Sequence, residues 1–307
     1  QTCALPILSP MIQALPGVWY AKRRKTPCYL YVQDLWPENV EIITGITNKK
    51  FIGSIGKMVD YIYAKCTMIF TTSISFVDSI EKRGVQREKI QYWPQYAEDF
   101  YFPLEKTRID EIPNDNNFNI IFAGNIGNAQ GLDILPKTAV LLKKNKLNRN
   151  IRFNIVGEGR YKETLEELVN TRSVSHMFNF IPRQPANCIP KFMAANDAAF
   201  LCLTDGDLFS MTIPAKLQSY MACGIPIIAS ANGETYKIIT ESKAGVCAPA
   251  GDAEKLAEAI IELSSKSFDE LKQLAVKSRE YYDKNFNKQE LLYKMDRYFD
   301  NKEILED

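Results

Sequence analysis

The most constraining feature of the sequence is an alternation of short β-branched or aromatic runs with longer helical stretches from Cys28 onward. This alternation favours an α/β fold with a mainly parallel sheet. Strands are expected at 118–123, 152–156, 177–180, 198–203, 226–230 and 245–248. Helices are expected at 132–144, 161–171, 189–195, 214–223, 253–264, 269–284 and 288–300. Six strands separated by helices make a complete doubly wound domain.

The domain organisation follows from where this rhythm breaks. Residues 1–104 predict strands only at 29–33, 67–72 and 89–93, too few to close such a sheet, so this N-terminal domain is expected to be incomplete. Residues 1–8 show no periodic pattern of hydrophobic residues, and they are a candidate non-native stretch. Residues 105–117 are the expected linker, because the tract is rich in acidic and turn-forming residues and includes Pro113. Residues 118–284 form the expected second domain, and a final helical stretch, 285–307, is expected to pack back toward the N-terminal domain.

Composition excludes several classes of protein. The 307 residues are 46% hydrophobic and 24% charged with a net charge of +1, which is typical of a soluble globular chain and calls for no nucleic acid. No apolar run approaches the roughly 18 residues that a membrane span needs. Seven scattered cysteines without a C-x-x-C pair indicate reduced thiols and a cytoplasmic location. With His176 as the single histidine, we expect neither a metal site nor a Ser-His-Asp triad.

Two glycine-containing turns follow predicted strands. The first includes Gly124, Asn125, Gly127 and Gln130, and the second begins at Gly157. Glycine lets the backbone approach a phosphate closely, and a helix N-terminus offers free N–H groups with about half a positive charge. A plain strand-to-helix turn would look the same. The glycines do not have the G-x-G-x-x-G spacing of dinucleotide-binding turns, and no acidic residue stands at the end of the following strand. Both observations argue against an NAD-binding site.

A third segment, 210–234, carries the strongest signal. Thr212 could cap a helix that Pro214 opens, and Lys216 and Ser219 would then share one helix face. Gly224 is placed to end the helix. A helix N-terminus bearing a lysine between two parallel strands suits a diphosphate group. The alternative is a solvated lysine on an ordinary helix.

The stretch from Ile213 to Gly224 resembles the sugar-nucleotide site of family-4 retaining glycosyltransferases. More narrowly, it is similar to the branch that includes fucosamine and colanic-acid fucosyl transferases. The segments 33–38, 83–85, 181–185 and 194–197 agree, so the resemblance runs from about residue 27 to about residue 298. It implies a GT-B fold, in which two Rossmann-like doubly wound domains face a cleft, and catalysis that needs no metal or other cofactor.

This sequence departs from the wider family at its binding residues. The family's two acidic residues, eight positions apart with the second on the ribose, correspond here to Met211 and Ser219. Asn125 and Gln130 stand where the resemblance implies an arginine and a lysine for the diphosphate. We therefore expect Lys216, with the backbone N–H groups of 212–215 and 124–127, to hold the diphosphate, and Gln218 or Ser219 to bind the ribose.

The full set of expected site residues follows from these assignments. Arg183 is a second candidate cation, or the partner of a surface acid, and Asp34 either faces the acceptor or caps a turn. The catalytic candidates are Lys216 and Asp34. The donor-binding candidates are Gly124, Asn125, Gly127, Gln130, Gly157, Arg183, Thr212, Ile213, Pro214, Lys216, Gln218, Ser219, Gly233 and Glu234.

The resemblance implies a retaining glycosyltransferase. Its donor would be a nucleotide-diphosphate sugar, with a UDP-N-acetylamino sugar favoured and GDP-fucose second. Its acceptor would be a polyprenyl-diphosphate-linked glycan in O-antigen, capsule or exopolysaccharide synthesis. The alternatives are a non-catalytic nucleotide-binding scaffold and a nucleotide-sugar 2-epimerase, which the single histidine disfavours.

The N-terminal region is basic. Residues 1–65 contain eight Lys or Arg against four Asp or Glu, concentrated in Lys22–Lys25 and in the amphipathic segment Lys49–Val59. Such a surface could rest on anionic lipid at the cytoplasmic face of the inner membrane. It could equally be a solvated face over a core helix.

Overall fold

The computed structural model describes residues 7–8, 11–145 and 147–299, and these divide into two compact units. The first unit comprises 1–95, 211–213 and 288–307, and the second comprises 96–210 and 214–287. Each unit contains one sheet made entirely of parallel strands. In the described residues, no helix combines the length and the apolar character needed to cross a membrane.

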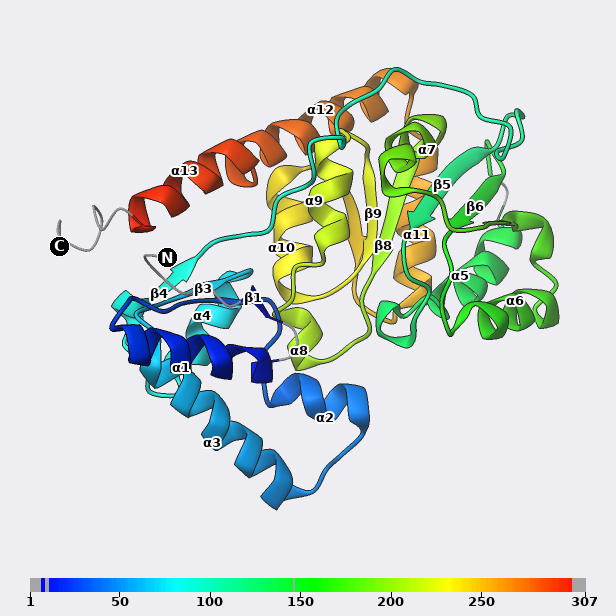
Figure 1. The fold of residues 1–307 in the computed structure, drawn as a ribbon. Helices are drawn as coiled ribbons and strands as arrows, with labels where there is room; N and C mark the ends of the chain where they lie inside the picture. The colour runs from blue at the N-terminus through cyan, green and yellow to red at the C-terminus, as the bar shows by residue number, and fades with distance from the viewer. Residues whose placement is uncertain (1–6, 9–10, 146, 300–307) are drawn as a thin grey trace. The chain divides into compact units, whose positions relative to one another are not determined.

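The second unit contains a six-stranded sheet in the order β10-β9-β8-β5-β6-β7 (Figure 1). All pairs are parallel, and the order reverses between β5 and its neighbour β8. The predicted doubly wound sheet is confirmed, and each strand lies within two residues of its expected position. The strands are β5 Phe118–Ala123, β6 Ile151–Val156, β7 Phe178–Ile181, β8 Ala198–Cys202, β9 Ile227–Ser230 and β10 Gly245–Ala248.

Helices of the second unit cover both faces of this sheet. Helices α5 and α11 pack together on one face, and right-handed crossovers place α9 and α10 on the other. Two helices, α8 and α10, are absent from the sequence-based prediction. The helices are α5 Ile134–Lys143, α6 Lys162–Thr171, α7 Ile189–Ala195, α8 Asp207–Ser210, α9 Ala215–Ala222, α10 Gly233–Ser242, α11 Ala253–Ser264 and α12 Phe268–Asn285.

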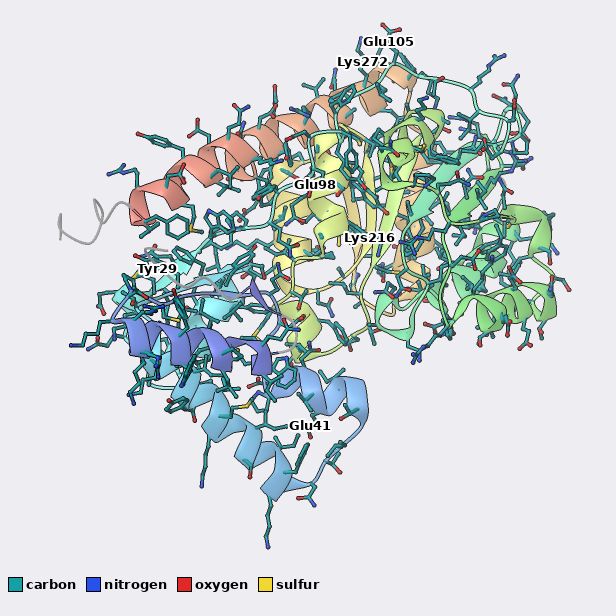
Figure 2. The ribbon with its side chains drawn as sticks, in the orientation of Figure 1. Tyr29, Glu41, Glu98, Glu105, Lys216 and Lys272 are labelled. Atoms are coloured by element: carbon teal, nitrogen blue, oxygen red, sulfur yellow. The ribbon has the colours of Figure 1, made fainter. Side chains whose placement is uncertain are left out.

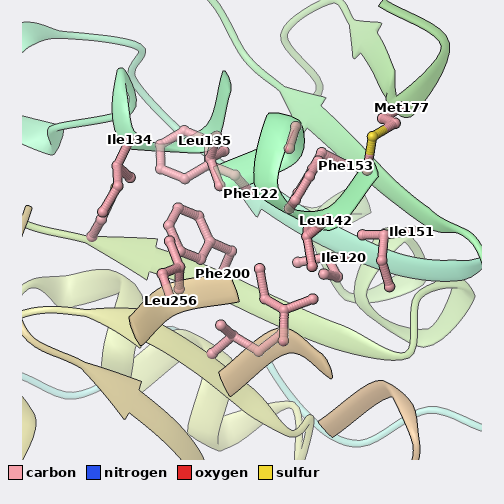
Figure 3. Close-up of a cluster of buried hydrophobic side chains, with 14 of the residues drawn as sticks. Ile120, Phe122, Ile134, Leu135, Leu142, Ile151, Phe153, Met177, Phe200 and Leu256 are labelled. Atoms are coloured by element: carbon pink, nitrogen blue, oxygen red, sulfur yellow. The ribbon is translucent and has the colours of Figure 1, made fainter. Parts of the chain in front are cut away.

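A buried apolar cluster holds α5 and α11 against the strands (Figure 3). Phe122 and Phe200, from adjacent strands, lie next to Leu135 of α5 and Leu256 of α11, and all four are at most 1% exposed. A fully buried side chain of this size stabilises the fold by about 1.5–3 kcal/mol. The cluster therefore fixes the central strand β5, whose carboxyl end enters the first glycine turn.

The first unit has a four-stranded parallel sheet in the order β1-β2-β3-β4. Residues 1–6 of the stretch expected to be non-native lie outside the described residues. Ile7 and Leu8, however, pair in parallel with Tyr31 and Val32, so this sheet has a strand that the sequence analysis missed. Its strands are β1 Ile7–Leu8, β2 Tyr29–Val32, β3 Met68–Thr71 and β4 Ile90–Tyr92. Its helices are α1 Ala14–Arg24, α2 Glu38–Thr44, α3 Lys49–Lys65, α4 Ile74–Glu81 and α13 Lys288–Phe299.

The observed division of the chain differs from the sequence-based boundaries at 104, 117 and 284. The segment after Gln95 belongs to the second unit because the Ala97 N–H donates to the Tyr282 hydroxyl at 3.2 Å. Helix α13 belongs to the first unit, where Met295 packs against the aromatic residues of β2 and β3. The Tyr29 hydroxyl also donates to the Tyr298 carbonyl at 3.1 Å.

Candidate functional site

A pocket with a volume of ≈ 430 Å³ opens in the second unit at the carboxyl ends of β5 and β6 and the start of α9. Its size is that of a small-ligand site, and its position is where doubly wound sheets bind ligands. Six of the expected donor-binding residues line it, namely Gly124, Asn125, Gly157, Arg183, Lys216 and Ser219. The other lining residues are Tyr101, Ala123, Val156, Glu158, Gln184, Ala186, Ile189, Ala215 and Tyr220.

Two glycines allow the wall of the pocket to close. Gly157 has φ +150°, and a Cβ atom there would lie 2.0 Å from the Gly124 carbonyl oxygen. Gly124 has φ +142°, and a Cβ atom there would lie 2.5 Å from Cε of Lys216. Both positions have a backbone conformation that L residues rarely adopt, and at Gly157 a side chain would also collide with the backbone of Gly124. The turns are therefore built for close backbone approach.

The expected cradle of backbone amides in the first turn is largely wrong. The Gly124 N–H donates to the Val156 carbonyl and the Ile126 N–H to the Glu158 carbonyl, both at 2.9 Å. The Gly127 N–H donates to the Gln130 side chain at 3.0 Å. These bonds tie the two turns together, so three of the four amides are already occupied. Gly127 and Gln130 therefore shape the turn and are not among the pocket-lining residues.

Helix α9 begins one residue later than expected. Pro214 has φ −72° and ψ 137°, so it is the N-cap rather than the first helical residue, and Thr212 does not cap the helix. The Leu217 N–H donates to the Pro214 carbonyl at 2.8 Å, which leaves the N–H groups of Ala215 and Lys216 at the helix start. Gly224, with φ +60°, follows the helix as predicted.

Lys216 projects from the first turn of α9 (Figure 2). Its Nζ lies 4.8 Å from the centre of the Phe122 ring. In the part of the chain that the structure describes, no carboxylate forms an ion pair with it. Burial lowers the pKa of Lys216, and the nearby Cys202 only partly opposes this shift. The ammonium group is thus half-buried, and no described residue gives it an anionic partner.

Three further side chains line the same pocket as Lys216. Arg183 is exposed on the loop after β7 and makes no ion pair with a described residue, so its expected surface acid is not found. Ser219 is half-buried, and its hydroxyl donates to the Ala215 carbonyl at 3.2 Å. Tyr101, which the sequence analysis did not select, lies beside Ser219. Its contribution could not be read from a motif because it comes from the segment before β5.

Several expected donor residues are not among those that line the pocket. Gln218 is 1% exposed, because it lies on the far face of α9 from Lys216, so of the two ribose candidates only Ser219 lines the pocket. Thr212 and Ile213 belong to the first unit, and Pro214 precedes the lining residues of α9.

Gly233 and Glu234 form the start of α10 and are also not lining residues. A Cβ atom at Gly233 would lie 2.0 Å from the Ser210 carbonyl oxygen, so this glycine serves helix packing. Asp34 follows β2 in the first unit. Among the described residues, no three His, Cys, Asp or Glu side chains group as a metal site would require.

Residues 105–289, more than half of the chain, match the family described as Glycosyl transferases group 1. The chain belongs to this family. It is 27% identical over 173 residues to a protein of Escherichia coli strain K12 provisionally described as the colanic acid biosynthesis glycosyl transferase WcaI. This match covers 54% of the chain and 41% of the relative. The chain is also 24% identical over 153 residues to the amylovoran biosynthesis glycosyltransferase AmsK of Erwinia amylovora. That match covers 49% of the chain and 37% of AmsK.

Solved structures show the fold of this family member. Anabaena Alr3699/HepE in complex with UDP and glucose superposes with a TM-score of 0.76 at 14% identity, over 97% of this chain and 78% of that one. The sucrose-phosphate synthase of Thermosynechococcus elongatus gives 0.72 at 16% identity, over 97% and 73%. The chain therefore has the predicted GT-B fold with Rossmann-like domains. Its matched part spans less than half the length of the curated relatives.

Proposed function

We propose that the second unit binds the nucleotide diphosphate of a sugar-nucleotide donor in the 430 Å³ pocket. The observation that carries this proposal is the half-buried ammonium of Lys216, which has no anionic partner in the described residues and stands at a glycine-lined wall. A cation held at a cost in desolvation is stabilised when a phosphate supplies the missing charge.

The diphosphate would lie between the start of α9 and the first glycine turn. Lys216 Nζ would contact it together with the N–H groups of Ala215 and Lys216, and the helix terminus adds partial positive charge. In the first turn, only the Asn125 N–H remains without a described acceptor. Arg183, which lines the same pocket, would supply a second positive charge.

The chemistry of the proposed transfer depends on the leaving group. Breaking the bond between the sugar and the diphosphate places negative charge on the terminal phosphate oxygens. Fixed cations and amides that face this charge lower the barrier more than they stabilise the bound substrate. The proposal is therefore a transfer with retention of configuration, without a metal, in which Lys216 stabilises the departing nucleotide diphosphate. Asp34 of the first unit is the proposed acceptor-side residue.

The donor and acceptor extend the same proposal. The HepE structure is a complex with UDP and glucose, which supports a uridine nucleotide, so a UDP-N-acetylamino sugar is favoured and GDP-fucose is second. The relatives named for colanic acid and amylovoran biosynthesis support a growing polysaccharide as the acceptor class. We propose a polyprenyl-diphosphate-linked glycan at the cytoplasmic face of the membrane.

Calorimetry with UDP and GDP tests the proposal. The wild-type chain should bind one of them, and Lys216→Met should weaken binding by about 30- to 150-fold, as expected when one charge-assisted hydrogen bond worth about 2–3 kcal/mol is removed. Lys237→Met is the matched control, since this lysine of α10 is exposed and outside the pocket. Equal affinity of Lys216→Met and wild type would refute the role of the ammonium.

A non-catalytic scaffold is the second candidate, because Met211 and Ser219 stand where the resemblance to family-4 glycosyltransferases implies an acidic pair. Nucleotide binding alone does not distinguish a glycosyltransferase from a scaffold. Incubation with a labelled donor and a lipid-linked glycan distinguishes them. Label transferred to the lipid establishes an enzyme, whereas binding without transfer at saturating substrate favours the scaffold.

A basic surface of the first unit supports contact with the membrane. Helices α1 and α3 pack together, and Trp19 on α1 is 62% exposed with the Arg23 guanidinium 5.7 Å from the centre of its ring. On α3, Phe51 is 49% exposed beside Lys49 and Lys50. Exposed aromatic rings with adjacent cations suit an anionic lipid surface.

Sedimentation with vesicles tests this contact. The chain should bind vesicles containing phosphatidylglycerol more strongly than vesicles of phosphatidylcholine alone, and Trp19→Ser with Phe51→Ser should reduce that binding. Equal binding to both vesicle types, or an unaffected double variant, would leave the surface as an ordinary solvated face.

A further inference from the structure

Strand β5 runs past the end of its pairing with β8. The two strands pair at Ile120 and Ile121, whereas β5 continues to Ala123. On its other side, the Gly124 N–H donates to the Val156 carbonyl of β6. Because successive residues of a strand direct their N–H groups to opposite sides, the Ala123 N–H is directed toward the side of β8, where the ladder has already ended.

The hydroxyl of Tyr220 takes the place of the missing strand partner. It accepts from the Ala123 N–H at 3.2 Å and donates to the Ala123 carbonyl at 3.4 Å. Tyr220 is 2% exposed and Ala123 is 8% exposed, so without this hydroxyl the strand would end on a buried N–H with no acceptor. Tyr220 belongs to α9, and its hydroxyl therefore joins that helix to the last residue of β5.

Lys216 contacts the residues on either side of Ala123. Its Nζ lies 4.8 Å from the centre of the Phe122 ring, and a Cβ atom at Gly124 would lie 2.5 Å from its Cε. Lys216 and Tyr220 are four residues apart on α9, so they share one face of the helix with Cβ atoms about 5–6 Å apart. The bond between Tyr220 and Ala123 therefore sets the distance between the start of α9 and the first glycine turn.

We infer that Tyr220 is a positioning residue of the donor site, whose hydroxyl fixes α9 against β5 and so holds the Lys216 ammonium where the diphosphate would lie. This inference rests on the proposed function. Burial raises the pKa of Tyr220, so the hydroxyl stays protonated at physiological pH and remains a donor. A tyrosine that only filled space would act through its ring, and loss of its hydroxyl would not change the affinity for a diphosphate.

A double-mutant cycle tests the inference by calorimetry, using UDP or GDP according to which binds the wild type. Tyr220→Phe keeps the ring and removes the hydroxyl, and it should weaken binding about three- to tenfold, the range for one neutral hydrogen bond. In the Lys216→Met background, the same change should alter the affinity less than about twofold, because the group that Tyr220 positions is gone.

Tyr282→Phe is the matched control. The Tyr282 hydroxyl also accepts a backbone N–H at 3.2 Å, that of Ala97, and Tyr282 is 7% exposed but does not line the pocket. Both tyrosine variants should lose stability in urea, and only Tyr220→Phe should lose affinity for the nucleotide.

The failure of the inference differs from the failure of the proposed function. If Tyr220→Phe leaves the affinity unchanged, or weakens it equally with and without the Lys216 ammonium, the inference is overturned while weaker binding by Lys216→Met still supports the donor site. If the wild type binds neither UDP nor GDP, the proposed function fails and the inference fails with it.

Hydrogen exchange provides a second test that needs no folded Tyr220 variant. In the wild type, bound nucleotide should slow exchange of the Ala123 N–H about threefold or more relative to the Ala97 N–H, because holding Lys216 also holds α9 and its bond to β5. In Lys216→Met at saturating nucleotide, this relative slowing should disappear. Slowing that persists in Lys216→Met, or none in the wild type, would overturn the inference.

Discussion

The two ends of strand β5 carry the same motif with different partners. At the carboxyl end, the Lys216 ammonium lies 4.8 Å from the centre of the Phe122 ring. At the amino end, the Arg149 guanidinium lies 5.2 Å from the centre of the Phe118 ring. Both cations rest on a buried phenylalanine of one strand. What differs is the anion that each of them meets.

Arg149 is satisfied within the chain. It donates to the Asp197 carboxylate at 3.1 Å and to the Asn117 carbonyl at 2.8 Å. Asp197 also accepts from Lys106 at 3.0 Å and from the Asn119 N–H at 2.8 Å. Lys216 has no such carboxylate among the described residues. A cation paired inside the fold contributes to stability, whereas a half-buried cation without an anion carries a desolvation cost that an external anion would relieve.

The groups around the two ends of β5 also differ in how completely they fill the space beside the strand. Near the amino end, the Asn154 side chain donates to Asn119 and Asn196, so buried polar groups satisfy each other across strands. At the carboxyl end, Gly124 and Gly157 lack side chains, and their backbones lie close to each other and to Lys216. One end is therefore filled, and the other is shaped around a pocket.

The largest effect is expected from Gly157→Ala, which disrupts the close approach of the two glycine turns. The new Cβ would lie 2.0 Å from the Gly124 carbonyl oxygen, so we expect a loss of about 3 kcal/mol or more in the free energy of unfolding, together with loss of nucleotide binding. Gly251→Ala is the matched control, since it also has positive φ, +79°, with no atom within 4 Å. Urea denaturation measures both. Similar losses in the two variants would show that the close approach is unimportant.

A smaller effect is expected from Asp197→Ala at the filled end. This change removes the shared acceptor of Arg149, Lys106 and the Asn119 N–H, and it should lower the free energy of unfolding by about 2–3 kcal/mol. Nucleotide affinity of the folded fraction should not change. If Asp197→Ala lowered nucleotide affinity without lowering the free energy of unfolding, the amino end of β5 would serve binding rather than stability, contrary to this comparison.

The smallest effect is expected from Lys216→Met on the ligand-free chain. Burial holds the pKa of Lys216 in the folded chain below the ordinary lysine value of 10.5, so keeping the charged form costs stability at neutral pH. The variant should therefore gain up to about 1 kcal/mol in unfolding free energy near pH 7. The gain should shrink as the pH rises through the folded pKa toward 10.5. Denaturant unfolding at several pH values measures it; a loss of stability at pH 7 would mean that the ammonium has an internal partner.

Short-range patterns account for what the sequence predicted well. Strand β5, the glycines at 124 and 157, and the position of Gly224 follow from local hydrophobic runs and turn chemistry, which act over a few residues. Sequence reasoning selected Lys216 because a lysine at a helix start next to buried strands has a readable local signature. It missed α10 because Gly233 and Glu234 were interpreted as binding residues rather than as a helix start.

The sequence by itself determined the fold class, the doubly wound second sheet and the lysine of the candidate site, because periodicity and turn residues encode these locally. Only the tertiary structure decided that the amides of Gly124, Ile126 and Gly127 are already bonded, that Gln218 lies outside the pocket, and that Tyr101 lines it. Each of these facts depends on atoms from segments distant in the chain. A hydrogen-bond partner or a facing side chain is set by packing, which no local pattern records.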